Sequence, residues 1–383
     1  MLDFTFTEEQ KMLRDVARKI TDNEVRPFAA MIDEKEELPF EIITKAAELG
    51  FLGVVFPEQY GGGGFGEIGY CILLEEIARG CNSTAVTIGG HESLGAMAIY
   101  LCGNEEQKQK YLRPLAEGKL LAAFALTEPN AGSDAASMKT FATENGKSFL
   151  LNGNKTFITN GNIADVLVVF AVTDASKGVK GITAFIVEKK WNGFRAGKPE
   201  KKMGIRGSHT TDLFFENLEV PKENILGEIG NGFKVAMETL DVARVSLAAQ
   251  CLGSSKEMLE LSVKHANERK QFGKPIAEQQ AIQFMLAEMA SEIYQAESII
   301  YRTAWMIDNN ITCSRESAIC KLVATETVCK IADRAMQIHG GMGYMREYPI
   351  ERLYRDARVN RIFEGTNEIQ HIVIARDVLK NGI

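Results

Sequence analysis

The sequence lacks the features that mark membrane, metal-binding and nucleic-acid-binding proteins. Its 383 residues contain no run of about 18 apolar residues, and the N-terminus has no apolar signal core, so we expect no membrane span and no secretory peptide. The five histidines are scattered without metal-ligand spacing, which argues against a metal site. Lys and Arg (44) are fewer than Asp and Glu (51), a net charge of −7, and no basic run occurs. Nucleic acid and anionic membranes are therefore poor candidate partners.

Disulfide spacing is also absent. The seven cysteines are odd in number and form no C-x-x-C pair, a pattern typical of reduced thiols in a cytoplasmic protein. Hydrophobic residues make up 45% and charged residues 25% of the chain, which are ordinary values for a globular protein. A chain of this length buries about three quarters of its unfolded surface, so its core needs no disulfide or metal.

The hydrophobic pattern divides the chain into three parts. The first third has helical periodicity, and its first helix begins with Thr7 as N-cap and Gln10 as capping-box partner. Short β-branched or aromatic segments follow, at 120–127, 148–153, 155–160, 166–172, 181–187 and 211–220. After Gly232 long apolar-faced helical segments return. We therefore predict an α+β protein with a helical domain (1–120), a central antiparallel β domain (121–230) and a helical bundle (231–383).

Four glycine-rich or polar segments could bind an anion or could simply shape the chain. Residues 60–66 contain G-x-G-x-x-G, but no second parallel strand follows, which favours a glycine-rich turn over a dinucleotide site. The segment 126–140 is either a ligand-binding turn or a capped turn before a helix. Residues 268–276 and 339–344 follow long helices, where they could clamp a phosphate or merely end the helix.

Glu364 is the candidate catalytic carboxylate. It follows the apolar pair Ile362–Phe363 and precedes Gly365. A carboxylate in an apolar pocket resists ionisation, so its pKa rises towards a value useful for a general base. The competing interpretation is a surface glutamate before a glycine turn.

Taken together, these segments resemble the acyl-CoA dehydrogenase family. LTEPNAGSD, KTFITNG, ERKQFGK, QIHGGMGY and YRDARVNRIFEGTNEIQ occur in the family's order and spacing, and the likeness covers essentially the whole chain. The resemblance implies an N-terminal helical domain, a central β domain and a C-terminal four-helix bundle, assembled as a homotetramer. It also implies non-covalent FAD, an acyl-CoA substrate, α,β-dehydrogenation to a trans-2-enoyl-CoA, and transfer of electrons to an electron-transferring flavoprotein.

The resemblance assigns roles to individual residues. Glu364 corresponds to the base that removes the α proton, and its backbone amide and an FAD hydroxyl would hold the thioester oxygen. The position of the base in other members is Ala243 here, which has no carboxylate. The implied FAD-binding residues are Phe124, Leu126, Thr127, Ser133, Phe157, Thr159, Arg269, Gln271, Phe272, Gln337, Gly341, Thr366 and Glu368, of which the 269–272 segment reaches a neighbouring subunit. The implied CoA-side residues are Ser133, Asp241, Arg244 and Gly365.

The acyl group and the direction of the reaction stay open. Ala85 stands where glutaryl-CoA dehydrogenases carry an arginine, which disfavours a dicarboxylic substrate. His91 and Glu92, on the segment that would line the acyl cavity, are either satisfied structural groups or recognise a cyclic or otherwise unusual acyl group. The same site could act as an enoyl-CoA reductase, and an oxidase or a catalytically inactive flavin- or CoA-binding protein are further alternatives.

Overall fold

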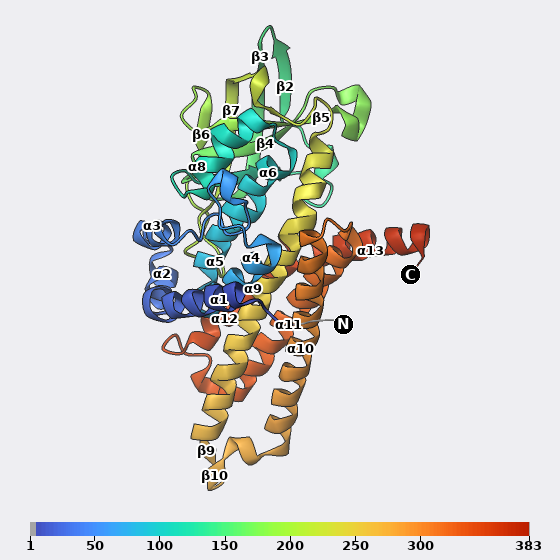
Figure 1. The fold of residues 1–383 in the computed structure, drawn as a ribbon. Helices are drawn as coiled ribbons and strands as arrows, with labels where there is room; N and C mark the ends of the chain where they lie inside the picture. Colours follow the sequence, from blue (N-terminus) through green and yellow to red (C-terminus); the bar gives the residue numbers. More distant parts are fainter. Residues whose placement is uncertain (1–4, 383) are drawn as a thin grey trace.

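The computed structural model describes residues 5–382 and forms an elongated molecule with the sheet at one end and long helices towards the other (Figure 1). The N-terminal helices are α1 (Glu8–Ile20), α2 (Ala29–Lys35), α3 (Phe40–Glu48), α4 (Gly66–Gly80), α5 (Asn82–Gly89), α6 (Met97–Cys102), α7 (Glu105–Gln107) and α8 (Arg113–Ala116). The strands of the sheet are β1 (Ala122–Ala125), β2 (Phe141–Asn145), β3 (Ser148–Thr159), β4 (Val166–Val172), β5 (Ile182–Glu188), β6 (Phe194–Ala196), β7 (Thr210–Pro221) and β8 (Ile225–Leu226). The C-terminal elements are α9 (Gly232–Glu268), the hairpin β9 (Lys270–Gln271) and β10 (Lys274–Pro275), α10 (Gln280–Asp308), α11 (Ser314–His339), α12 (Pro349–Ala357) and α13 (Asn367–Asn381).

The predicted order of helices, sheet and helices is confirmed. Thr7 caps α1, and its side chain and that of Gln10 form the expected capping box. The segment after Gly232 is one helix of 37 residues, α9, which runs from the sheet to the β9–β10 hairpin (Figure 1). Residues 61–65 lie in a turn before α4, which begins at Gly66, as the sequence indicates. None of the helices in residues 5–382 is long and apolar enough to cross a bilayer.

The central sheet has the order β6-β7-β3-β2-β4-β5-β8, with β1 paired to β4. Most neighbouring strands are antiparallel, as expected, but β1 and β2 both pair with β4 in the parallel direction. The segments expected at 148–153 and 155–160 are a single strand, β3, with two irregularities in its pairing to β7. The sequence analysis missed β2, although the Asn145–Gly146 turn that joins it to β3 is a hairpin signal and Gly146 has φ 62°.

Strand β4 is buried on both faces and joins the sheet to the helices. Val166, Val168 and Phe170 pack in a cluster with residues of α6 and α9. Leu167 and Val169, which point the other way, pack in the interior of the sheet domain. The continuous apolar sequence of β4 therefore follows from burial on two sides.

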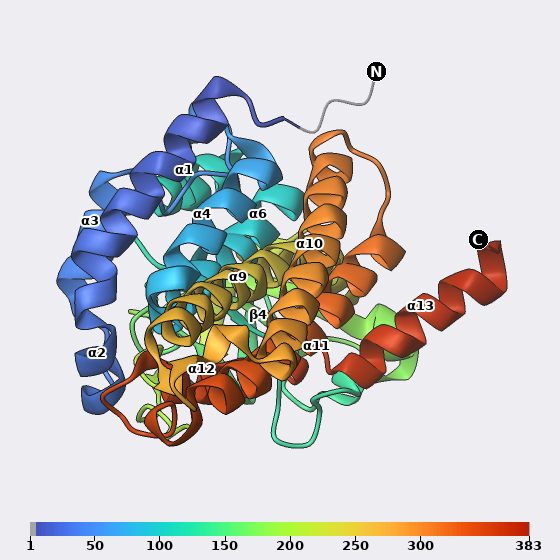
Figure 2. The ribbon, with the colours of Figure 1, turned by 90° about the horizontal axis from the view of Figure 1, so that it is seen from below.

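The C-terminal helices share a second core with α4. Side chains of α9, α10, α11 and α12 pack together around residues such as Met258, Met289 and Val328. Helix α13 contacts α11 at its start, where Asn367 binds Lys321, and near its end, where Asp377 pairs with Arg315 at 3.2 Å. Figure 2 shows α13 at the edge of the molecule. Leu379, near its C-terminal end, is 87% exposed.

Helices α4 and α9 approach closely at Gly253. A Cβ atom at this position would lie 2.0 Å from the backbone oxygen of Glu75, so only glycine fits. We expect Gly253→Ala to lower the melting temperature by separating the helices, at a cost of about 1–3 kcal/mol. The matched control is Gly89→Ala in α5, where no atom lies within 4 Å of the added methyl. Equal melting temperatures for Gly253→Ala and wild type in a thermal scan would contradict this packing.

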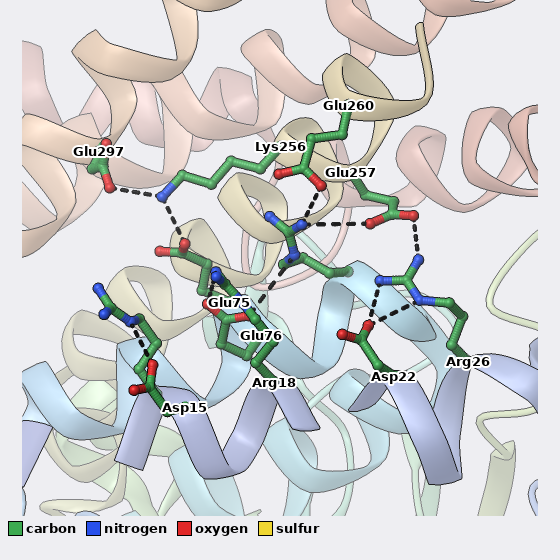
Figure 3. A network of polar contacts seen from close by, with 12 residues as sticks. Asp15, Arg18, Asp22, Arg26, Glu75, Glu76, Lys256, Glu257, Glu260 and Glu297 are labelled. Carbon is green, nitrogen blue, oxygen red and sulfur yellow. Dashed lines mark hydrogen bonds and ion pairs between the residues drawn. The ribbon is translucent and has the colours of Figure 1, made fainter. Parts of the chain in front are cut away.

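A network of ion pairs ties the N-terminal helices to α9 and α10 (Figure 3). Lys256 Nζ lies 2.6 Å from a carboxylate oxygen of Glu75 on α4 and 2.7 Å from one of Glu297 on α10. Arg18 on α1 binds the buried carboxylate of Glu76 on α4 at 2.7 Å. Further pairs join Arg26 to Asp22 and Glu257, and Arg79 to Glu257 and Glu260. Because several of these charges are buried and shared, the network fixes how the helices pack.

Candidate active site

Glu364 lies in the short loop between α12 and α13. Its φ of 55° is left-handed, a conformation that costs energy in any residue with a side chain and that is often found at functional sites. Its Oε2 is buried and has no hydrogen-bond partner. Burial raises the pKa of Glu364 to about 8, although the positive charges of Lys321 and Arg244 act in the opposite direction. The residue has the elevated proton affinity expected of a general base near neutral pH.

The backbone around Glu364 is held by the start of α13. The side-chain amide of Gln370 donates to the carbonyl of Gly365 at 2.9 Å and more weakly to that of Glu364 at 3.4 Å. Thr366 is the N-cap of α13 and accepts from the amide of Ile369 at 3.4 Å. The loop that presents the carboxylate is therefore anchored to a regular helix.

Two predicted CoA-side residues on α9 lie near Glu364. Arg244 is 4% exposed, and its Nη1 lies 2.7 Å from Oδ1 of Asp241. Burial lowers the pKa of Arg244, whereas the carboxylates of Asp241 and Glu364 raise it. Ala243, between them, is fully buried and carries no acid that could replace Glu364.

One group of predicted flavin-binding residues gathers where β1 and its following turn meet β3. The amide of Thr156 donates to the carbonyl of Thr127 at 2.9 Å, which places the turn beside Phe157. Phe157 is 66% exposed and has φ 56°, an unusual state for a large aromatic residue in a strand. Phe124, Leu126 and Thr159 line the same region from β1, the turn and the end of β3, and Ser133 is exposed in the turn.

The segment expected to line the acyl cavity lies against the end of β3. Asn160, just after β3, donates from its side chain to the carbonyl of Thr87 on α5 at 2.9 Å. A Cβ atom on Gly90 would lie 2.9 Å from Cγ2 of Thr159, so the backbone at Gly90 lies very close to the end of β3. This segment continues as a π-helical turn from Gly90 to Ala96, an irregularity common at functional sites.

The remaining predicted flavin-binding residues lie in two places: most of them near the β9–β10 end of the molecule, and Thr366 and Glu368 beside Glu364. The end of α9 and the β9–β10 hairpin carry Arg269, Gln271 and Phe272, and Figure 1 shows them far from β3 and from β4, the strand that pairs with β1. The stacked rings of His265 and His339, with centroids 4.4 Å apart, join the end of α9 to that of α11, which carries Gln337 and is followed by Gly341. Thr366 and Glu368 lie at the start of α13. One chain does not bring the residues near the β9–β10 hairpin together with those of β1 and β3.

His91 is a satisfied structural group. Its Nδ1 accepts from the amide of Ala122 at 2.9 Å, which leaves Nε2 to donate to the carbonyl of Leu52 at 3.1 Å. Burial lowers the pKa of His91 to about 4, so the ring is neutral.

Glu92, the next residue, is not fully satisfied. Its Oε1 accepts from the amide of Val55 at 2.9 Å, but the buried Oε2 has no partner. Burial raises the pKa of Glu92 well above its usual range.

The sequence analysis missed two buried lysines that shape the site. Lys155 on β3 donates to a carboxylate oxygen of Glu128 at 2.7 Å and to the carbonyl of Leu126 at 3.0 Å, and so binds the 126–140 turn to the sheet. Lys321 on α11 lies near Glu364 and is fully buried. Lysine at a single position of a strand or helix is usually exposed, and the neighbouring residues of Lys155 and Lys321 do not indicate burial. No signal in the sequence could therefore have identified them.

Comparison with known proteins agrees with this arrangement. Residues 7–119, 123–218 and 230–379 match the models of the N-terminal, middle and C-terminal domains of acyl-CoA dehydrogenase. The chain is 46% identical to the 3-(aryl)acrylate reductase of Clostridium sporogenes (98% of this chain, 100% of that protein) and 45% identical to the caffeyl-CoA reductase-Etf complex subunit CarC of Acetobacterium woodii (98% and 99%). The structure of butyryl-CoA dehydrogenase from Megasphaera elsdenii matches with a TM-score of 0.97 at 43% identity (99% of this chain, 100% of that chain).

These relatives are oxidoreductases that act on CH–CH bonds. The chain belongs to the acyl-CoA dehydrogenase family.

Proposed function

We propose that this protein interconverts an acyl-CoA and its trans-2-enoyl-CoA, with Glu364 as the residue that takes and returns the α proton. The observation that carries this proposal is the buried Oε2 of Glu364, which has no protein partner and belongs to a carboxyl with a pKa of about 8. A buried carboxylate oxygen without a hydrogen bond is poorly stabilised, so the carboxylate gains by accepting a proton from substrate. Asp241, Arg244, Ser133 and Gly365 are proposed to contact the CoA thioester.

The cofactor is FAD, and the residues present fit it. Phe157 and Phe272 expose 66% and 95% of their surfaces, and no atom lies within 4 Å of a Cβ built on Gly132, Gly340 or Gly341. Exposed aromatic faces and open backbone suit a planar ring system and a pyrophosphate. Phe124, Leu126, Thr127, Ser133, Phe157 and Thr159 would hold the ring end, whereas Arg269, Gln271, Phe272, Gln337, Gly341, Thr366 and Glu368 would hold the remainder. When bound, FAD supplies the acceptor for the β hydrogen and its two electrons.

The chain's own residues carry the proton chemistry. The ionised carboxylate of Glu364 takes the α proton as the α,β double bond forms, and in the reverse direction it returns that proton. Burial of the Glu364 carboxylate keeps its proton affinity high, and its Oε2 is closed to water. The nearby charge of Arg244 helps to stabilise negative charge that develops on the thioester.

Dehydrogenation is the main direction proposed, and reduction of an enoyl-CoA is the alternative. The reductases among the relatives favour the alternative, whereas butyryl-CoA dehydrogenase favours the main proposal. Anaerobic bleaching of the flavin by a panel of acyl-CoAs tests the function. Reoxidation of the chemically reduced flavin by the matching enoyl-CoAs tests the reverse reaction. Failure of all acyl-CoAs and enoyl-CoAs to change the flavin spectrum would contradict the proposal.

The protein is proposed to act as a homotetramer that exchanges electrons with an electron-transferring flavoprotein. The separation of Arg269, Gln271 and Phe272 from the proposed flavin-binding residues of β1 and β3 supports assembly, because a second copy of the chain would supply them. The Etf complex of the CarC relative supports the electron partner. We also propose domain boundaries after residues 120 and 230. A cytoplasmic location is proposed because all seven cysteines, which lie among the described residues, are free.

Arg269 offers a direct test of the shared cofactor site. We expect Arg269→Ala to weaken FAD binding by about one to two orders of magnitude, the usual value of one charge-assisted contact to a phosphate. The matched control is Lys264→Ala, an exposed cation about one turn earlier on α9. Dilution of each holoenzyme, followed by flavin fluorescence and sedimentation, measures FAD release and assembly together. Equal FAD retention by Arg269→Ala and the control would contradict the assignment.

A further inference from the structure

Lys321 lies on α11, next to the loop that carries Glu364. Its Nζ donates to the side-chain oxygen of Asn367 at 2.8 Å, and the hydroxyl of Thr325 donates to the same oxygen at 3.0 Å. The amide nitrogen of Asn367 donates to Oε1 of Glu326 at 2.7 Å, and Oε2 of Glu326 accepts from Arg361. Arg361 and Asn367 are three residues before and after Glu364. Both ends of the loop are therefore fastened to neighbouring turns of α11.

The charge of Lys321 has no direct carboxylate partner. Its side chain is fully buried, and within residues 5–382 carboxylates act on it only through longer-range charge effects, without an ion pair. A buried ammonium whose hydrogen bond goes to a neutral amide is still costly, so a compensating charge nearby is expected. Glu364 is the carboxyl that acts most strongly on it, and the Oε2 of Glu364 also lacks a partner. The two groups are thus each other's main electrostatic counterpart without touching.

We infer that Lys321 is a positioning residue for Glu364: it fastens the catalytic loop through Asn367, and its charge favours the ionised form of the carboxylate, which accepts the proton. This inference rests on the proposed role of Glu364 as base. It assigns to Lys321 a contribution to the reaction that requires no contact with substrate or cofactor.

Other charged and titratable groups surround Glu364, and none duplicates Lys321. Arg244 on α9 also favours the ionised carboxylate, but its charge is already paired with Asp241. Tyr70 on α4 and Cys251 on α9 are buried neutral groups near Glu364, and burial raises the pKa of each. Glu368 on α13 acts on Lys321 less strongly than Glu364 does. Lys321 is therefore the buried cation in this group that no carboxylate in contact neutralises.

Lys321→Met removes the charge and keeps the length of the side chain. Burial raises the pKa of Glu364 to about 8, and the positive charge of Lys321 opposes that rise more than any other charge. Burial lowers the pKa of Lys321 itself to about 8, so its charge is present below that pH, and removing it there raises the pKa of Glu364 further. The rising limb of flavin reduction against pH should move up by about 1–3 pH units, the effect of one nearby opposite charge. The rate at pH 7 should fall by about tenfold or more, and the difference from wild type should shrink as the pH rises. A purely structural role would lower the rate by the same factor at every pH.

Two further variants separate the parts of the inference. Asn367→Ala removes the fastening but leaves the charge, so it should lower the rate at all pH values with little movement of the rising limb. Lys256→Met removes a partly buried cation that pairs with Glu75 and Glu297 away from Glu364, and it should leave the limb in place. Lys321→Gln serves where the Met variant does not retain FAD. Each variant is measured as FAD-loaded tetramer by anaerobic stopped flow with one reactive acyl-CoA.

A rising limb that stays at the wild-type pH in both Lys321 variants would overturn the inference. The Glu364→Gln enzyme, measured beside them, distinguishes this result from failure of the proposed function. If Glu364→Gln is slow and the Lys321 variants keep the wild-type limb, the inference alone is wrong. If Glu364→Gln reduces its flavin as fast as wild type, the base lies elsewhere, and both fail.

Discussion

Flavin reduction by acyl-CoA should slow by about two to four orders of magnitude when Glu364 is replaced with glutamine. Glutamine keeps the shape of the side chain but cannot take the α proton. FAD content and binding of CoA thioesters should persist, because the residues proposed to hold them are unchanged. Anaerobic stopped flow under single-turnover conditions measures the step, and a rate equal to that of wild type would contradict the assignment.

Glu106→Gln is the matched control for this prediction. Glu106 is an exposed carboxylate in α7, far in sequence from the loop. The same chemical change there should leave the rate of flavin reduction unaltered. A comparable loss of rate in Glu106→Gln would show that the effect does not report on a base at Glu364.

The wild-type rate should depend on pH, and so should the difference in stability between wild type and the Glu364→Gln variant. The rate should rise with pH through a carboxyl whose pKa is about 8, because only the ionised form takes a proton. This pKa lies above the ordinary value of 4.5, so the Glu364 carboxyl binds a proton more tightly in the folded state than in the unfolded state. The free energy of unfolding of wild type should therefore fall as the pH rises from 4.5 to about 8. Glu364→Gln should therefore melt at a higher temperature than wild type at pH 8, with the gain absent near pH 4.5.

Replacement of Lys155 with methionine should destabilise the protein by about 3–5 kcal/mol, because it leaves the carboxylate of Glu128 buried without its cation. Lys155 is fully buried and Glu128 is 6% exposed. Glu128 also accepts from the amides of Lys139 at 2.6 Å and Thr140 at 3.0 Å, so it closes the 126–140 turn on itself. Loss of the pair should loosen the turn that carries Thr127 and Ser133, and FAD should dissociate more readily.

The matched control for Lys155→Met is Lys139→Met. Lys139 lies in the same turn, but its side chain is exposed and only its backbone amide binds Glu128. Thermal scans followed by flavin fluorescence measure unfolding and FAD release in one experiment. If Lys155→Met melts and releases FAD as the control does, the buried pair does not hold the turn.

The sequence predicted those features that depend on neighbours within a few residues. The capping box of Thr7 and Gln10, the 37-residue α9 and the end of α11 before Gly340 each follow from local hydrogen bonding or helical periodicity. The order of helices, sheet and helices follows from the same signals. Glu364 was a candidate because of its apolar neighbours and the following glycine, and the structure supplies the burial on which its raised pKa depends.

Only the tertiary structure decided the contacts between distant segments. The parallel pairing of β1 with β4, the fit of Gly253 against Glu75, and the neutral state of His91 require residues far apart in sequence to meet. The same holds for the meeting of α11 with the Glu364 loop at Lys321 and Asn367. Propensity and spacing act over about one turn of helix, whereas these contacts depend on how whole elements pack. The buried charges that shape the site are therefore visible in the fold and not in the pattern of the sequence.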